Sequence, residues 1–331
     1  MKQSRFLAGT LLVAVSLAAC SGDGDGDGST GDVAGEDYPS GPVTMTVGAD
    51  PGSGFDITLR TVVTLLQQEE LVEVPMPVEN APGAASAVWT AQMVEQHEGA
   101  DDQVSVTSLV MMTNNARGQS DYNYDDVTMI ARLISEYYVV VTSADSEYTD
   151  LASVLDAVVE DPGAVPVGAA SDDQLPFALL VDAAGGDASQ VNFVAYEGGG
   201  EQSAALLSGD IEVAIAGTSE FLPLIESGEL NALTVIGEEQ LEGLPDVPTA
   251  VEEGYDVTIS NWRGIYGPPE MPDYAVEYWQ GVLEEAVATD AWAEAAEQNQ
   301  WVTTFMVEDE LDAYLEETNQ QVVDAFETIG Q

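Results

Sequence analysis

Cysteine and histidine are almost absent from this chain. The 331 residues include one cysteine, Cys20, and one histidine, His97. A single thiol cannot form an intramolecular disulfide, so no disulfide framework holds the fold. His97 lies in the polar run Glu95–Gly99, which is more typical of a solvated helix end than of a catalytic base or a metal ligand.

Basic residues are also scarce, with 6 Lys and Arg against 60 Asp and Glu and a net charge of −54. Nucleic acid is excluded as a partner, because phosphate contacts require a basic surface. The acids are scattered over polar faces, and 45% of the residues are hydrophobic, which argues against an acidic disordered protein. At about 1 M salt the Debye length is roughly 3 Å, so the composition indicates a surface adapted to brine.

Catalytic signatures are missing as well. The sequence has no Gly-x-Ser-x-Gly elbow, no Gly-Lys-Ser/Thr phosphate loop and no Gly-x-Gly-x-x-Gly dinucleotide pattern. With 60 carboxylates, acidic pairs arise by chance at any spacing and indicate neither a metal site nor a glycosidase. We therefore expect a protein that is not an enzyme, with no catalytic residue, no cofactor and no metal.

The N-terminus has the order of a secretory signal. Lys2 and Arg5 precede an apolar run over residues 6–15, and Leu17-Ala18-Ala19 leads to Cys20. The run is shorter than the about 20 residues of a membrane-spanning helix. An ordinary signal peptide would not need a cysteine there. We predict a signal peptide over residues 1–19 and lipidation of Cys20; the loss of Lys2 and Arg5 leaves four arginines against 60 acids, a net charge of −56.

A Gly/Asp repeat follows the cysteine at residues 21–31. It has nothing to bury and predicts a flexible tether over residues 20–37. A calcium loop is the alternative, but the repeat lacks the bidentate acidic residue that closes such a loop. Patterned sequence begins near Tyr38 and leaves enough chain for two modest lobes. No internal repeat or membrane span follows the signal.

Strands and helices alternate along the rest of the chain. The predicted strands are 43–48, 72–78, 104–112, 129–142, 164–169, 191–195, 211–216, 230–236, 259–266 and 302–307. The predicted helices are 56–66, 84–96, 151–159, 176–184, 200–207 and 221–227, with a mainly helical end after residue 271. Alternation with short Gly-rich turns is typical of doubly wound α/β lobes. Two long extended stretches predict lobe 1 over 38–142 and 262–331 and lobe 2 over 143–261.

Three Gly-rich loops after strands could hold a ligand, because ligands of open α/β sheets sit at the carboxyl ends of strands. Loop 50–56 precedes a helix whose amides form an anion site, although Asp56 could be a plain N-cap on a turn. Loops 168–174 and 196–200 come from the second lobe. Tyr196 could stack on a ligand or be an ordinary strand-end aromatic residue.

Several motifs resemble those of the substrate-binding receptors of tripartite tricarboxylate transporters, the Bug-type solute receptors. Leu244-Pro245-Asp246-Val247-Pro248-Thr249-Ala250-Val251-Glu252-Glu253-Gly254 is the most specific stretch. The others are Tyr38-Pro39, Pro51–Asp56 with Arg60, Asn80–Ala84, Tyr124–Leu133, Asn261-Trp262-Arg263-Gly264 and Gly267-Pro268-Pro269. The resemblance runs from Tyr38 to the C-terminus.

The resemblance implies a type II periplasmic-binding-protein fold, with two doubly wound lobes joined by two crossover strands. It also implies a monomeric, extracytoplasmic receptor that delivers a small organic acid to the membrane subunits of an ion-gradient-driven permease. Cys20 would anchor it through lipid to the outer face of the cell membrane, or in a periplasm if a second membrane is present. The implied ligand contacts are Gly52, Ser53, Gly54, Phe55, Asp56, Thr113, Asn114, Ser171, Asp172, Tyr196, Gly198, Gly199, Gly217 and Thr218.

The sequence departs from the family pattern at two places. Ser53 replaces a glycine of the first loop, and Asp172-Asp173 stand where the family usually has a Gly/Ser-rich turn. Two carboxylates facing the cleft would repel a di- or tricarboxylate, so either they point outward or the ligand is less anionic. An exported, lipid-anchored hydrolase of two-lobed α/β fold is the alternative function, but it would need a nucleophile or metal set that the sequence does not offer.

Overall fold

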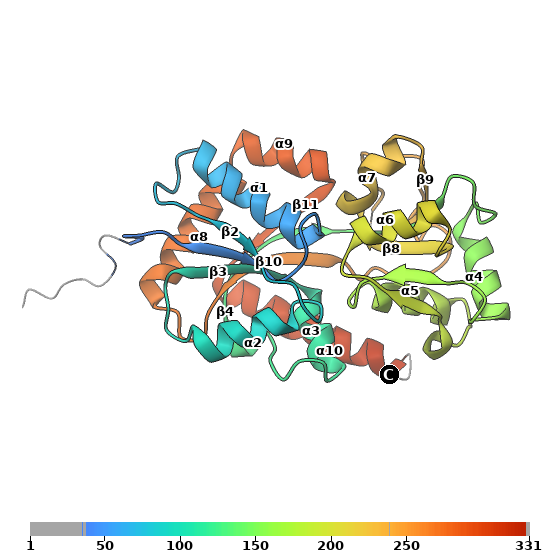
Figure 1. Cartoon of the computed structure of the whole chain (residues 1–331), viewed down its shortest axis with the longest axis horizontal. Helices are drawn as coiled ribbons and strands as arrows, with labels where there is room; N and C mark the ends of the chain where they lie inside the picture. The colour runs from blue at the N-terminus through green and yellow to red at the C-terminus, as the bar shows by residue number, and fades with distance from the viewer. Residues whose placement is uncertain (1–34, 36–37, 238, 329–331) are drawn as a thin grey trace, which may run out of the picture. The chain divides into compact units, whose positions relative to one another are not determined.

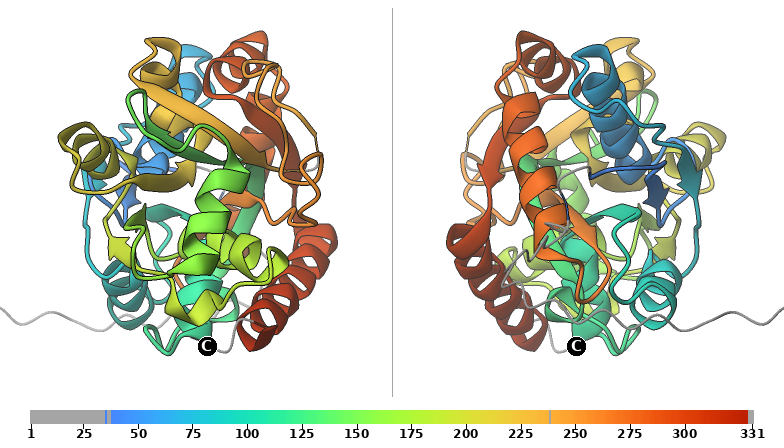
Figure 2. Two further views of the ribbon diagram at one scale, coloured as in Figure 1. Left: turned by 90° about the vertical axis from the view of Figure 1, so that its right-hand side faces the viewer. Right: turned by 90° about the vertical axis from the view of Figure 1, so that its left-hand side faces the viewer.

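The computed structural model describes residues 35, 38–237 and 239–328. The predicted signal peptide, the tether and Cys20 lie outside these residues, apart from Gly35. The described chain forms two sheets, each covered by helices (Figure 1). Figure 2 shows α8 (Asp273–Val287) nearest the viewer on the side of the first sheet and α4 (Leu151–Glu160) on the side of the second. The predicted type II periplasmic-binding-protein fold is confirmed.

The first sheet has the strand order β11-β4-β10-β3-β1-β2. Its neighbours β1, β2 and β3 are parallel, whereas β10 runs antiparallel between β3 and β4. The strands are β1 (Thr44–Val47), β2 (Val78–Asn80), β3 (Gln103–Ser108), β4 (Thr128–Glu136), β10 (Asn261–Gly267) and β11 (Trp301–Met306). The helices are α1 (Gly54–Gln68), α2 (Ala87–Gln96), α3 (Leu109–Ala116), α8, α9 (Asp290–Asn299) and α10 (Glu308–Thr328).

The second sheet has the order β7-β6-β8-β5-β9. Its strands are β5 (Tyr138–Ser143), β6 (Val167–Ala169), β7 (Phe193–Ala195), β8 (Val213–Gly217) and β9 (Leu230–Ile236). Its helices are α4, α5 (Gln174–Ala183), α6 (Gly199–Ser208) and α7 (Thr218–Glu226). Successive side chains of a strand point to opposite faces. Val213 and Ile215 accordingly pack in one apolar core and Ala214 and Ala216 in another, which makes this sheet the middle layer of three.

The chain crosses between the sheets twice. It passes from β4 to β5 at Tyr137 and returns at β10. Because β5 pairs with β8 and β9, the first crossover lies before residue 138 rather than after residue 142, where the sequence placed the lobe boundary. The return before Asn261 lies next to the predicted one.

A shared apolar core links the two lobes on the side of α10. Leu109 of α3 and Leu175 of α5 lie in one buried cluster with Leu311 and Phe326 of α10. Figure 1 shows α10 below both sheets, near α3 and α5. This contact holds the second lobe against the first beside the crossover strands.

Two predicted strands are wrong in part. The strand over 104–112 ends at Ser108, and residues 109–112 belong to α3, because the Ser108 hydroxyl caps that helix by accepting from the Val110 amide. In the strand over 72–78 only Val78 is in β2. Pro75 and Pro77 lack the amide hydrogen that a strand pairing needs.

Candidate functional site

The loop before α1 carries the first part of the site. Ser53 caps the helix, and the Asp56 carboxylate accepts from the Gly52 amide at 2.9 Å and from Arg60 Nε at 2.7 Å. Asn80 Nδ2 donates to the same carboxylate at 3.0 Å. Among the described residues, the amides of Gly54 and Phe55 have no hydrogen-bond acceptor. Asp56 thus stabilises the loop, while the two amides at the N-terminus of α1 remain free to donate hydrogen bonds.

The second lobe contributes two helix N-termini at which an amide already binds a carboxylate of the chain. The Gly199 amide of α6 donates to Glu220 Oε2 at 2.7 Å. The Ser219 amide of α7 donates to Glu136 Oε1 at 2.9 Å. In the loop before α5, the Ala170 amide donates to Asp173 Oδ2 at 3.3 Å. The protein's own carboxylates therefore occupy amides of α6, of α7 and of this loop that could otherwise bind an anion.

The two lobes enclose a cavity of about 50 Å³, which has room for a few water molecules. At one edge of the cavity Gly198 of the second lobe lies directly against Ser53 of the first, since a methyl group on Gly198 would be 3.3 Å from the Ser53 Cβ. A ligand of several carbon atoms therefore requires the lobes to separate. The lining consists of Ala49, Ser53, Gly54, Phe55, Ala85, Val110, Ala170, Asp172, Asp173, Tyr196, Glu197, Gly198, Glu220, Asn261 and Arg263.

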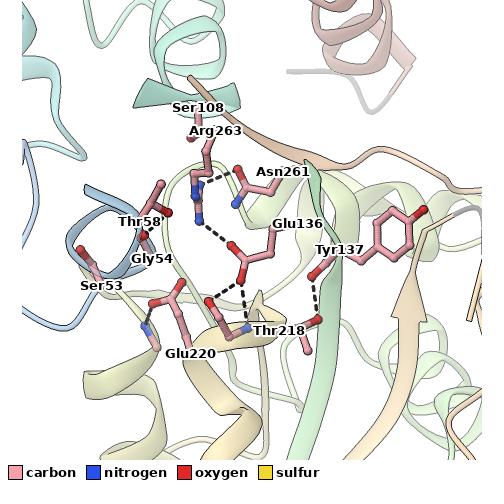
Figure 3. Close-up of polar contacts among 12 residues, drawn as sticks. Ser53, Gly54, Thr58, Ser108, Glu136, Tyr137, Thr218, Glu220, Asn261 and Arg263 are labelled. Carbon is pink, nitrogen blue, oxygen red and sulfur yellow. Dashed lines mark hydrogen bonds and ion pairs between the residues drawn. The ribbon is translucent and has the colours of Figure 1, made fainter. Parts of the chain in front are cut away.

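A buried ion pair lies beside this cavity (Figure 3). Arg263 on β10 is 3% exposed and donates from Nη2 to Glu136 Oε2 at 3.0 Å, while Glu136 at the end of β4 is fully buried. Arg263 Nη1 donates to Asn261 Oδ1 at 2.7 Å, and its guanidinium lies 5.1 Å from the Phe55 ring centre. The charge of Arg263 is thus already neutralised within the protein.

The other carboxyl groups of the cavity wall lack such a partner. Burial raises the pKa of Glu220 to about 7, with a further contribution from the nearby Glu136. Burial also raises the pKa of Asp172, and it raises that of Asp173 well above its usual range, where Asp172 and Glu220 add to the effect. Both aspartates line the cavity and are less than 10% exposed. The cavity wall therefore resists a further negative charge.

Six residues that the sequence singled out line the cavity. They are Ser53, Gly54, Phe55, Asp172, Tyr196 and Gly198. Four others support its walls. Gly52 and Asp56 shape the first loop, Gly199 binds Glu220 through its amide, and Gly217 lies against Glu136, where a Cβ would be 2.6 Å from the carboxylate.

The remaining four predicted residues lie off the cavity wall. Thr113 and Asn114 are buried in α3, where the Asn114 amide donates to Ala85 O at 2.8 Å. Ser171 O accepts from Arg117 at 2.7 Å. Thr218 Oγ1 donates to Tyr137 O at 2.8 Å. These contacts hold the surrounding segments together in this conformation.

Sequence reasoning missed part of the charged wall. Asp173 and Glu197 lie in the two loops that it proposed for the second lobe, whereas Glu136, Glu220, Asn261 and Arg263 were not predicted as ligand contacts. Arg263 is one of the four arginines that follow Cys20 in the sequence, and it lies among the apolar residues of an expected strand. That position could have indicated a buried acidic partner for Arg263, because a cation in a buried strand requires one.

Neither a metal centre nor a membrane span is found in the described part of the chain. No group of three or more His, Cys, Asp or Glu side chains there could hold a metal ion. No helix of residues 38–237 and 239–328 combines the length and hydrophobicity needed to cross a bilayer.

Comparisons with known proteins agree on one family. The sequence model described as "Tripartite tricarboxylate transporter family receptor" matches residues 61–330. Protein BugT of Bordetella pertussis is 24% identical over 274 residues, which cover 81% of this chain and 83% of that protein.

Two solved structures share the fold. The periplasmic binding protein BugD superposes with a TM-score of 0.80 at 20% identity, over 88% of this chain and 99% of that one. MatC from Rhodopseudomonas palustris, solved with bound malate, gives 0.77 at 20% identity over 87% and 99% of the two chains.

Proposed function

Because the chain belongs to the tripartite tricarboxylate transporter receptor family, whose members are receptors and not enzymes, we propose that it is an extracytoplasmic solute receptor. In this proposal it captures a small organic acid between its two lobes. It then delivers the acid to a membrane permease driven by an ion gradient. Cys20, outside the described residues, carries the lipid that keeps the receptor at the membrane.

The observation that supports this proposal most is the cavity between the lobes. The open amides of Gly54 and Phe55 lie at the N-terminus of α1, and both residues line the cavity. A helix N-terminus favours negative charge because its amides and the helix dipole both act on it. A ligand carboxylate therefore has one suitable place in the first lobe. The bound malate of the related MatC structure is consistent with an acid as the ligand.

Ligand-induced stabilisation of the full-length protein tests this function. A bound ligand stabilises a protein by RT ln(1 + [L]/Kd), which is about 2.7 kcal/mol at a concentration of 100 Kd. We expect at least one compound in a panel of two- to six-carbon hydroxy-, keto-, amino- and dicarboxylic acids, malate included, to raise the unfolding temperature saturably. A panel in which no compound does so, together with turnover of an ester or glycoside, would show that the protein is not a receptor.

A matched pair of glycine variants on α6 locates the binding site. A Cβ on Gly199 would lie 2.6 Å from the Glu220 Cβ, whereas one on Gly200 would meet no atom within 4 Å. We expect Gly199→Ala to displace Glu220 and weaken the binding of the stabilising acid about tenfold or more. Gly200→Ala should bind as the wild type does. Equal affinities for both variants would place the ligand elsewhere.

A further inference from the structure

The cavity wall carries more negative than positive charge. Asp172, Asp173, Glu197 and Glu220 line it, and Arg263 is the one basic residue among the lining residues. Only two ion pairs occur within the described residues, Arg60 with Asp56 and Arg263 with Glu136. None of the four lining carboxylates is therefore neutralised by an ion pair. A ligand with two or three carboxylates would add like charge to this wall.

Several donors that a second carboxylate could use are already occupied. In the second lobe, the amides of Gly199, Ser219 and Ala170 donate to carboxylates of the chain itself. Both Nη atoms of Arg263 donate to protein oxygens. A second carboxylate bound at any of these places would have to displace these bonds. Besides the amides of Gly54 and Phe55, the donors of the wall that remain open include Arg263 Nε and the side-chain amide of Asn261.

Acceptors, in contrast, remain open. Asp173 Oδ1 and Glu220 Oε1 receive no hydrogen bond from any described residue, although each partner oxygen does. Glu220 Oε1 is also 3.2 Å from the position that a Cβ of Gly54 would take, and Arg263 Nη2 is nearer still to that position. The open carboxylate oxygen of the second lobe is thus close to Gly54, whose amide is open in the first. A place for positive charge adjoins a place for negative charge.

We propose that the ligand of this receptor is a small zwitterion, an organic acid that also carries an ammonium group. Its carboxylate binds the amides of Gly54 and Phe55, and its ammonium binds the carboxylates of Asp173 and Glu220. The close approach of the two places favours a compound whose charges are separated by few atoms. This inference rests on the proposed function and specifies the class of solute.

Proton exchange on binding has opposite signs for the two classes of ligand. An ammonium beside Glu220 and Asp173 favours their ionised forms, so its binding releases protons. The affinity should therefore increase as the pH rises towards and through about 7, which is the pKa of Glu220 in the empty site. A dianion favours the protonated forms and therefore takes up protons. The titratable and charged groups around these two carboxyls are Asp172 on the loop before α5, Glu197 before α6, Glu136 on β4, Tyr138 on β5, Arg263 on β10 and Arg117 after α3.

Calorimetric titration of the full-length protein with matched compounds distinguishes the classes. Lactate and alanine differ by a hydroxyl and an ammonium on the same carbon, and succinate and 4-aminobutanoate differ by one end group. We expect the ammonium member of at least one pair to bind ten times more tightly or better than its partner. Repeating the titration in buffers of different ionisation enthalpy should show proton release.

Three outcomes separate the inference from the function it rests on. Tighter binding of an ammonium compound with proton release supports the zwitterion. Tighter binding of lactate or succinate with proton uptake overturns the zwitterion and leaves the receptor function standing. Binding by no acid of the wider panel and by none of these four compounds overturns both.

Two glutamate variants on α7 provide the matched control. Glu220→Gln removes one charge that faces the ammonium but keeps an oxygen that accepts from the Gly199 amide. This variant should therefore bind the ammonium compound at least ten times more weakly and release fewer protons on binding. Glu226→Gln, on the exposed end of the same helix, should change neither quantity. Undiminished affinity and proton release in Glu220→Gln would refute the assigned place of the ammonium.

Discussion

Neutralising Glu220 should stabilise the empty protein above neutral pH. Its folded-state pKa is about 7, against 4.5 for an unperturbed glutamate. The difference of about 2.5 pH units corresponds to about 3 kcal/mol at about 1.4 kcal/mol per unit. Since glutamine resembles the protonated carboxyl and still accepts from the Gly199 amide, Glu220→Gln should gain up to about this amount at pH 8 or so.

The gain should depend on pH in a defined direction. Above about pH 7 Glu220 is ionised in both the folded and the unfolded state, so the wild type bears the full cost of its buried charge. Between about 7 and 4.5 the folded state binds the proton more tightly, and wild-type stability therefore rises as the pH falls. The difference between wild type and Glu220→Gln should thus shrink towards zero near pH 4.5.

Urea unfolding at both ends of this range measures the effect. Salt of about 1 M throughout keeps the surface charges screened, so the pH dependence of the difference reports mainly on the cavity. The exposed Glu226→Gln should stay within about 0.5 kcal/mol of the wild type at each pH. A Glu220→Gln protein that is no more stable than the wild type at high pH, or whose gain persists unchanged near pH 5, would refute the reasoning.

Three further predictions concern the wall, α3 and the surface charge. Arg263→Met leaves the buried Glu136 carboxylate without a cationic partner and should cost roughly 3–5 kcal/mol of unfolding free energy. Adding Glu136→Gln should recover part of this loss, and a double variant no more stable than the single one would contradict a charge-based cost. Asn114→Ala removes the bond to Ala85 O and should cost about 1–3 kcal/mol with unchanged ligand affinity; a large affinity loss would instead make Asn114 a ligand contact. Dilution from about 2 M to about 0.1 M salt should lower the unfolding temperature, because a net charge of −54 then repels itself over about 10 Å, and an unchanged temperature would count against adaptation to brine.

The sequence was informative where structure depends on nearby residues. The alternation of strands and helices and the Gly-rich loop before α1 follow from local patterns, and Asp56 reaches its Gly52 and Arg60 partners within one turn of helix. The error at residues 109–112 has a physical cause, since a short apolar run fits a buried helix as well as a strand. Ser108 was the local sign of a helix start that could have corrected it.

The charged wall depends instead on contacts between distant segments. Glu136 and Arg263 are 127 residues apart, and any of 60 acidic residues could have paired with a given arginine. Whether Asp172 and Asp173 point outward could not be predicted from the sequence either, because their orientation depends on how the second lobe meets the first. Both of them line the cavity.

The apolar core under α10 predicts on which side the two lobes separate. Rotation that pulled α3 away from α5 would expose Leu109, Leu175 and Phe326, which are now buried together, at about 25 cal/mol for each Å². On the opposite side, the Gly243 amide of the second lobe donates to Gln300 Oε1 of the first at 2.7 Å. This contact is polar, so water can replace it. This contrast predicts that the lobes separate by rotation about α10 and open between α1 and the paired helices α6 and α7. Under the proposed function, a permease that bound across this opening would contact a surface present only while the receptor is closed.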